Sequence, residues 1–346
     1  MRIRGLDFLR GIAIIGVLCR HSEMQNVITR VGGFGVDLFF VLSGFLVASL
    51  LFTEYQKTGS TNIGRFLIRR GFKIIPVFYV CLGLTILIDT FYFNRTPTIL
   101  NILTEAFFLQ SYGVPMRFHT WSLSVEEHFY MILAFLVFLA VKFKWLNYTK
   151  SVIVFLGAVI TLIFTMRLIF CLHHIENPVN FFATHLRADG LFTGVLLSYL
   201  WHFKASVIER WKRRRLILYL LAIVFIIPIF VFPSDSFFIL TFGYNLMHFG
   251  FAILIILFAD KNQEPFVIKH PYLKHISISI CFLGINSYSI YLWHLLVKDL
   301  LFSETQSVAF GTTIFFTAAI TFGVLSSFLI EKQFIKIRDR YFRRIV

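Results

Sequence analysis

Residues 4–21 have the sequence RGLDFLRGIAIIGVLCRH, an apolar run interrupted by Asp7, Arg10 and His21. Ionisable groups inside a bilayer are expensive, so they usually mark a functional interior face. Arg10 and His21 are eleven residues apart, close to three helical turns, so they point the same way about 16 Å apart along the axis. The alternative is that both reach opposite headgroup layers. An anchoring residue at position 21 would more often be Trp, Tyr or Lys, which favours the interior face.

The composition describes a membrane protein. Of 346 residues, 58% are hydrophobic and only 15% are charged, against about 25% charged in average proteins. Apolar runs of about 20 residues recur along the chain, which predicts an all-α, polytopic transmembrane bundle forming a single domain, residues 1–346. We expect about ten spans, roughly at 6–24, 33–52, 73–93, 121–141, 151–171, 186–202, 216–232, 237–259, 277–302 and 309–330. The shorter run 99–112 holds polar residues and is predicted to be interfacial or re-entrant.

The distribution of Lys and Arg predicts the orientation. With the amino terminus inside, 25 of the 33 cations fall in inner segments, as the positive-inside rule requires. We therefore expect both termini to be cytoplasmic, in a multi-pass protein of the inner or plasma membrane. This topology accounts for the net charge of +15, so nucleic-acid binding is not needed to explain it. Because Asp7 and Arg10 interrupt the first run and no small-residue cleavage site follows, we expect a retained first helix.

Metal binding is not predicted. The four cysteines each lie within an apolar span, where they are expected to pack as small hydrophobic residues: Cys19, Cys81, Cys171 and Cys281. No CxxC or HExxH pattern is present, and the adjacent His173 and His174 are poorly spaced for one ligand face.

Asp37 lies near the outer end of the second span, at a depth similar to that of His21. One interpretation is a carboxylate that orients the imidazole and raises its basicity. The other is a carboxylate placed at a helix N-terminus by the helix dipole. The sequence leaves both open.

A basic cluster runs into the third span. Arg65, Arg69 and Lys73 share one helical face, and Arg70 lies next to it. The positive-inside rule explains charge here but does not require a tight cluster. A cytoplasmic anion with several phosphates fits better, because the Arg fork binds phosphate in a bidentate manner.

The fourth span opens with WSLSVEEHFY, residues 121–130. Ser122, Glu126 and Tyr130 are spaced i, i+4, i+8 and form one polar stripe. The adjacent carboxylates of Glu126 and Glu127 are costly unless they face protein or water, and two such groups suit acid–base chemistry.

Together these segments resemble the acyltransferase 3 family of integral-membrane acyltransferases. The motifs that carry the resemblance are Arg10-x10-His21, FFVLSGFL at 39–46, Arg69-Arg70-x-x-Lys73 before Pro76, WSLSVEEHFY at 121–130, RADGLFTG at 187–194 and SYSIYLWH at 287–294. They extend over essentially the whole chain. The chain departs from the family pattern at Lys73, where Arg is usual, and at Gln333, where Pro is usual.

The resemblance implies transfer of an acyl group, most commonly acetyl, from cytoplasmic acyl-CoA to a hydroxyl of an extracytoplasmic glycan or lipid-linked saccharide. The implied acceptors include lipopolysaccharide O-antigen and exopolysaccharide, although peptidoglycan or a small secreted molecule would fit equally. The basic cluster would hold the CoA phosphates, and Arg10 would line the route of the pantetheine arm. His21 would act as general base, oriented by Glu126, by Glu127 as second choice, or by Asp37. A covalent acyl-His intermediate is the rival mechanism.

Other residues are expected at the acceptor. Candidates for substrate binding are Trp121, Ser122, Tyr130, Arg187, Asp189, Trp293 and His294. His294 could equally be a core histidine bonded to a neighbouring helix. Arg187 and Asp189 form either a structural ion pair or an acceptor contact. The competing function is a transporter or flippase of a lipid-linked saccharide. No inverted repeat supports it, and the inner Arg cluster suits a nucleotide-bearing donor.

Overall fold

The computed structural model describes residues 3–22, 24, 26–174, 181–260, 270–301 and 308–342, and every regular element in these ranges is helical. The first half comprises α1 (Arg4–His21), α2 (Val27–Gly32), α3 (Gly35–Thr58), α4 (Ile63–Phe91), α5 (Ile99–Ala106), η1 (Phe118–Thr120), α6 (Trp121–Lys142), η2 (Trp145–Asn147) and α7 (Thr149–His174). The second half comprises α8 (Thr184–Arg187), α9 (Asp189–Phe203), α10 (Ala205–Lys212), α11 (Arg215–Ile226), α12 (Pro228–Val231), η4 (Ile239–Gly243), α13 (Tyr244–Ala259), η5 (Pro271–Leu273), α15 (Lys274–Ile285), α16 (Ser287–Leu301), α17 (Val308–Ser326), η6 (Ser327–Glu331) and α18 (Lys332–Tyr341).

The chain is a multi-pass membrane protein of all-helical architecture. Six described helices are long and apolar enough to cross a membrane, or up to eight if each of two bent pairs is one span. The pairs are α9 with α10, bent by 100°, and α15 with α16, bent by 77°. α1 is not among the six because Arg4, Asp7, Arg10 and Arg20 dilute its apolar run. The count of ten spans and the cytoplasmic termini stay predictions.

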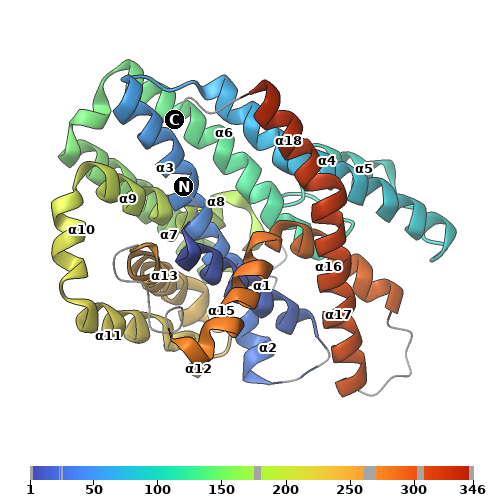
Figure 1. The fold of residues 1–346 in the computed structure, drawn as a ribbon. Coiled ribbons are helices and arrows are strands. Elements are labelled where there is room, and N and C mark those ends of the chain that lie inside the picture. Colours follow the sequence, from blue (N-terminus) through green and yellow to red (C-terminus); the bar gives the residue numbers. More distant parts are fainter. Residues whose placement is uncertain are drawn as a thin grey trace.

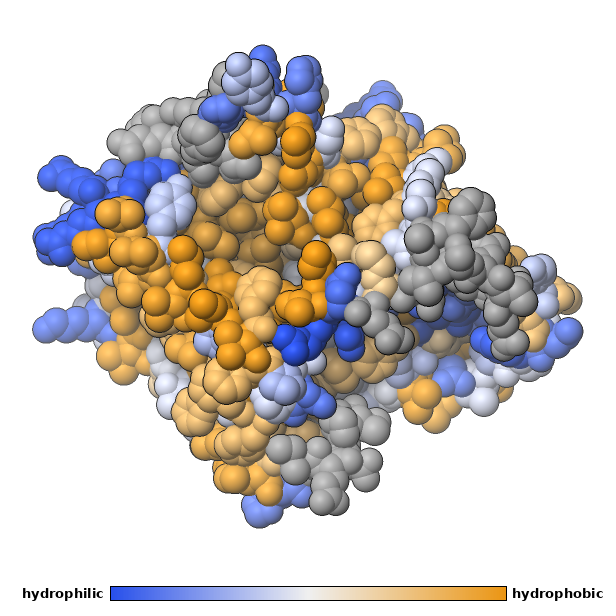
Figure 2. Space-filling view, turned by 90° about the horizontal axis from the view of Figure 1, so that it is seen from below, coloured by the Kyte–Doolittle hydropathy of each residue, from blue (hydrophilic) through white to orange (hydrophobic). Residues whose placement is uncertain are grey.

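The segment predicted to be interfacial, 99–112, contains only the eight-residue α5, which is too short to span a bilayer. Large apolar side chains cover the outside of the bundle, for example Leu87 on α4, Phe135 on α6 and Leu172 on α7. Figure 2 shows a face that is largely hydrophobic, with hydrophilic residues gathered near its middle and at its rims. The basic segments 261–269 and 343–346, which the charge argument uses, lie outside the described residues.

α1 occupies the middle of the bundle, where it contacts α3, α13, α15 and α16 (Figure 1). Asp7 is buried and Arg10 and His21 are half-buried, so these three face protein at least in part, whereas Arg4 and Arg20 near the helix ends are exposed. α3 crosses α9 closely at Gly44 and Gly194. A Cβ on Gly44 would overlap the carbonyl group of Leu191, and one on Gly194 would overlap the carbonyl oxygen of Val41. Small residues therefore set the close approach of these two helices.

Candidate active site

A large basic cavity opens among α1, α3, α4 and the carboxyl-terminal helices. Its volume is about 970 Å³, and eight Lys or Arg side chains line it against three acidic ones. All five residues predicted to bind the phosphate-bearing substrate lie in its wall: Arg10, Arg65, Arg69, Arg70 and Lys73. α4 begins at Ile63, where the Asn62 side chain accepts a hydrogen bond from the Arg65 N–H, so the four cations of α4 sit on its first three turns.

These cations differ in how far they are already neutralised. Arg69 pairs with Asp339 of α18 at 2.7 Å. Arg70 pairs with Glu126 at 3.1 Å and also donates to the Tyr130 hydroxyl. Arg65 is half-buried and forms no ion pair with a described residue. Lys73 likewise forms no ion pair with a described residue. Among the three arginines of the cluster, Arg65 is therefore the one whose guanidinium is best prepared to bind a new anion.

Several charged residues of this wall were not predicted, among them Lys57, Glu331, Lys332 and Arg338. Glu331 is buried and accepts a hydrogen bond from Ser289 at 2.8 Å. A signal for it exists, because Glu331 is the only ionisable residue in the apolar run 308–331. The three cations carry no such signal, since basic residues flank spans generally.

A cluster of three imidazoles lies at a second level of the bundle. The ring centres of His21 and His294 are 5.0 Å apart, and those of His294 and His119 are 4.8 Å apart. α1 supplies His21 at its last residue, η1 supplies His119 just before α6, and α16 supplies His294. Tyr291 completes the cluster, with its ring 5.4 Å from His119 and 5.5 Å from His294.

Backbone carbonyls fix two of these imidazoles. His294 Nδ1 donates a hydrogen bond to the backbone carbonyl of Tyr291, one turn earlier in α16. His119 Nε2 donates to the backbone carbonyl of Leu292 at 3.1 Å. A carbonyl only accepts, so these two nitrogens carry the hydrogens. The opposite nitrogens, His294 Nε2 and His119 Nδ1, are buried and have no hydrogen-bond partner among the described residues. Each ring therefore holds an unused lone pair inside the protein.

Two helices connect the basic cavity with the histidine cluster. On α1, Arg10 lines the cavity and His21 belongs to the cluster. On α6, Glu126 contacts Arg70 at the cavity, whereas Ser122 hydrogen-bonds the Tyr291 hydroxyl at 2.6 Å. The two sites are thus about three helical turns apart along α1.

The wall of the cavity reaches Arg10, Ser43 and Arg70 but not His21. The rings of Phe39 and Tyr291 contact each other edge to face, with their centres 6.4 Å apart. Phe39 lies one turn from Ser43 on α3. Neither Phe39 nor Tyr291 lines the cavity, and Tyr291 belongs to the histidine cluster.

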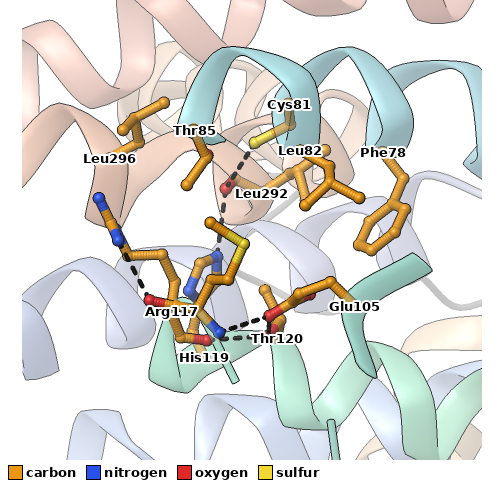
Figure 3. A pocket seen from close by; sticks show the side chains of 11 residues that line it. Phe78, Cys81, Leu82, Thr85, Glu105, Arg117, His119, Thr120, Leu292 and Leu296 are labelled. Carbon is orange, nitrogen blue, oxygen red and sulfur yellow. Dashed lines mark hydrogen bonds between the residues drawn. The ribbon is translucent and has the colours of Figure 1, made fainter. Parts of the chain in front are cut away.

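A small pocket lies on the far side of His119 (Figure 3). Its volume is about 20 Å³, which is room for about one water. Glu105 stands beside it and accepts hydrogen bonds from Thr120 Oγ1 and the Met116 N–H, both at 2.9 Å. On the other side Arg117 pairs with Asp89 at 2.6 Å and Asp299 at 2.8 Å. These bonds anchor the segment that carries His119.

Comparison with known proteins decides the family. The model of the acyltransferase 3 family, described as "Acyltransferase domain", matches residues 3–332. The chain belongs to the acyltransferase 3 family. Peptidoglycan O-acetyltransferase OatA of Listeria monocytogenes is 29% identical over 321 residues, 84% of this chain and 49% of that protein. O-acetyltransferase OatA of Staphylococcus aureus is 28% identical over 317 residues, with the same coverage of 84% and 49%.

A Staphylococcus aureus (strain COL) protein named provisionally as an O-acetyltransferase is 28% identical over 370 residues, 96% of this chain and 57% of that protein. The chain therefore spans about half the length of the curated relatives it matches. No solved structure matches the chain.

Within this acyltransferase 3 chain, the carboxylates predicted to orient His21 lie elsewhere. Asp37 pairs with Arg187 at 2.8 Å and with His248 at 3.2 Å. Glu126 contacts Arg70, Tyr130 and, at 3.2 Å, Ser43. Glu127 forms no hydrogen bond with another described residue. Neither Asp37 nor Glu126 hydrogen-bonds His21 in the structure, because a similar depth in the membrane does not place two side chains on facing sides of their helices. Their role in orienting His21 stays a prediction.

Arg187 and Asp189 were predicted to form a pair or an acceptor contact, and they bind different partners instead. Asp189 pairs with Arg167 at 2.7 Å, and His248 stands 3.6 Å from Asp189 and 3.2 Å from Asp37. All five side chains of this network are buried. The network joins α3, α7, α8, α9 and α13, so it helps to hold these helices together.

The two tryptophans predicted at the acceptor are also packed. Trp293 is 1% exposed and donates to Ser326 at 2.7 Å. Trp121 packs at right angles against Phe40, with ring centres 5.9 Å apart, and beneath the Arg187 guanidinium. Neither residue lines the basic cavity or the pocket of Figure 3. Among the described residues, no group of three or more His, Cys, Asp or Glu side chains could hold a metal ion.

Proposed function

We propose that this chain is a membrane O-acetyltransferase that takes acetyl from cytoplasmic acetyl-CoA and delivers it to a hydroxyl of an extracytoplasmic glycan. The observation that carries the proposal is that one central helix, α1, bears Arg10 in the basic cavity and His21 in the histidine cluster. The names of the relatives, two of which are O-acetyltransferases and one of which acts on peptidoglycan, support the reaction and the acceptor class.

The basic cavity suits the donor. Coenzyme A carries an adenosine 3′-phosphate and a diphosphate, and guanidinium forks bind such groups through charge-assisted hydrogen bonds. The excess of cations in the wall favours an anion of high charge. Arg10 lies deepest on α1, where it would accompany the pantetheine arm toward the cluster.

The histidine cluster suits the transfer. An imidazole lone pair takes the proton of the acceptor hydroxyl while the oxygen of that hydroxyl attacks the carbonyl carbon of the thioester. The carbon–sulfur bond then breaks, and the proton passes from the imidazolium to the departing thiolate, giving an acetyl ester and free coenzyme A. His21 is the half-buried member of the cluster and is therefore the one that substrates can reach.

The test uses purified protein, acetyl-CoA labelled in the acetyl group, and a panel of peptidoglycan fragments, O-antigen and exopolysaccharide. We expect label in one glycan with the wild-type protein and none with His21→Ala. Unchanged transfer by His21→Ala would reject the mechanism. Movement of unmodified saccharide across the bilayer without acetyl transfer would instead indicate a flippase.

A further inference from the structure

His294 has one ring nitrogen for which the part of the chain that the structure describes supplies no hydrogen-bond partner. The side chain is 0% exposed, its Nδ1–H donates to the Tyr291 carbonyl, and its Nε2 is buried and unpartnered. A buried polar atom without a hydrogen bond is costly, so such an atom in a native site calls for an explanation. Because Nδ1 carries the hydrogen, Nε2 needs a donor.

The neighbouring imidazole of His119 cannot be that donor. Its Nε2–H is committed to the Leu292 carbonyl, and its Nδ1 is a second lone pair without a partner. Two lone pairs do not form a hydrogen bond. The hydroxyl of Tyr291, the other polar group of the cluster, is committed to the His119 carbonyl at 2.8 Å.

His21 can be the donor. Its ring forms no hydrogen bond with another described residue, and its centre lies 5.0 Å from that of His294. A ring nitrogen lies about 1.2 Å from the ring centre, so an N–H···N bond of about 3 Å places two edge-facing rings roughly 5.4 Å apart. The observed separation is close to this, and the 53° tilt requires only a ring rotation. Catalytic hydrogen bonds are often poorly aligned before substrate binds.

We propose that His294 is the positioning residue for His21: its Nε2 accepts the N–H of one His21 nitrogen and so turns the lone pair of the other nitrogen toward the acceptor hydroxyl. The proposed chain of hydrogen bonds runs from the Tyr291 carbonyl through His294 and His21 to the substrate hydroxyl. This inference rests on the proposed function, and His294 takes the place expected for Asp37 or Glu126. When His21 gains the substrate proton, His294 Nε2 still accepts a hydrogen bond from the imidazolium and stabilises it.

Two variants separate this role from a structural one. Asn at 294 places its amide near Nδ1, so His294→Asn keeps a donor for the Tyr291 carbonyl but removes the acceptor facing His21. Gln at 294 places its amide oxygen near Nε2, so His294→Gln restores that acceptor. We expect His294→Asn to lower kcat by about 100-fold with the KM for acetyl-CoA unchanged, and His294→Gln to recover activity to within about tenfold of wild type. Thermal unfolding in detergent monitors folding of both variants.

Activity of folded His294→Asn within threefold of wild type would overturn the inference. Equal inactivity of both folded variants would also overturn it, because a hydrogen-bond acceptor at the Nε2 position would then not suffice. A failure of the proposed function looks different, since acetyl transfer would then be absent from the wild-type protein or unaffected in His21→Ala.

Discussion

Arg65 offers the sharpest test of the donor site. It lines the basic cavity and forms no ion pair with a described residue, whereas Arg69 and Arg70 already bind Asp339 and Glu126. Arg65→Gln therefore removes a phosphate contact without leaving an acid unpaired. A hydrogen bond to a charged group contributes about 1.5 to 3 kcal/mol. Since 1.4 kcal/mol is tenfold in affinity, we expect the KM for acetyl-CoA to rise by about 10- to 100-fold, with kcat within about threefold.

Steady-state kinetics of the purified variants measure this, with exposed Arg213 in the turn after α10 as the control position. Arg213→Gln changes the net charge equally and should leave the KM unchanged. A donor that lacks the 3′-phosphate tells which phosphate Arg65 binds, because the effect of Arg65→Gln disappears if that phosphate is missing. An equal rise in the KM for acetyl-CoA in Arg65→Gln and Arg213→Gln would refute the cavity as the donor site. The rise would then come from the change in the net charge of the protein.

Three further changes test other parts of the account. Asp189→Asn leaves the buried Arg167 without its counter-ion, so we expect about 3 to 5 kcal/mol of destabilisation, seen as earlier thermal unfolding in detergent. Gly44→Ala inserts a methyl group into the backbone of α9 and should abolish the monodisperse peak in size-exclusion chromatography. Gly157→Ala, which meets no atom within 4 Å, should not. Glu126→Gln loosens Arg70 and should raise the KM for acetyl-CoA; loss of kcat at saturating donor would place Glu126 in the transfer step instead.

Helical spacing predicted which cations gather in one place. Arg65, Arg69 and Lys73 recur every four residues, so any helix through them has one basic face, and the structure turns that face into the cavity. Arg10 was assigned to the donor route by the resemblance to the acyltransferase 3 family, and not by helical spacing. Their common wall could not be derived from spacing alone, because it depends on how α1, α4 and the carboxyl-terminal helices pack.

The partners of the buried carboxylates could not be predicted in this way. Sequence gives the depth of Asp37 along its helix, but in an apolar span the pattern does not say which side faces protein, because lipid-facing residues are apolar too. One available signal was overlooked. Arg187 and Asp189 are two residues apart, and residues so spaced on a helix do not face each other, which disfavours a mutual pair.

The histidine cluster illustrates the remaining limit. His21, His119 and His294 come from three separate elements, and only tertiary packing brings their rings within about 5 Å of one another. The sequence singled out His21 and His294 for other reasons. The sequence contains no sign that backbone carbonyls would fix the hydrogens of His119 and His294, nor that their other nitrogens would have no partner among the described residues.

The central claim is that acetyl crosses the bilayer through this chain, from the basic cavity to the histidine cluster. Proteoliposomes with labelled acetyl-CoA outside and an acceptor glycan trapped inside test it directly. The account predicts labelled glycan in the lumen with the wild-type protein, and none with His21→Ala reconstituted at equal density. Labelled glycan only when the donor and the glycan share one compartment would contradict it.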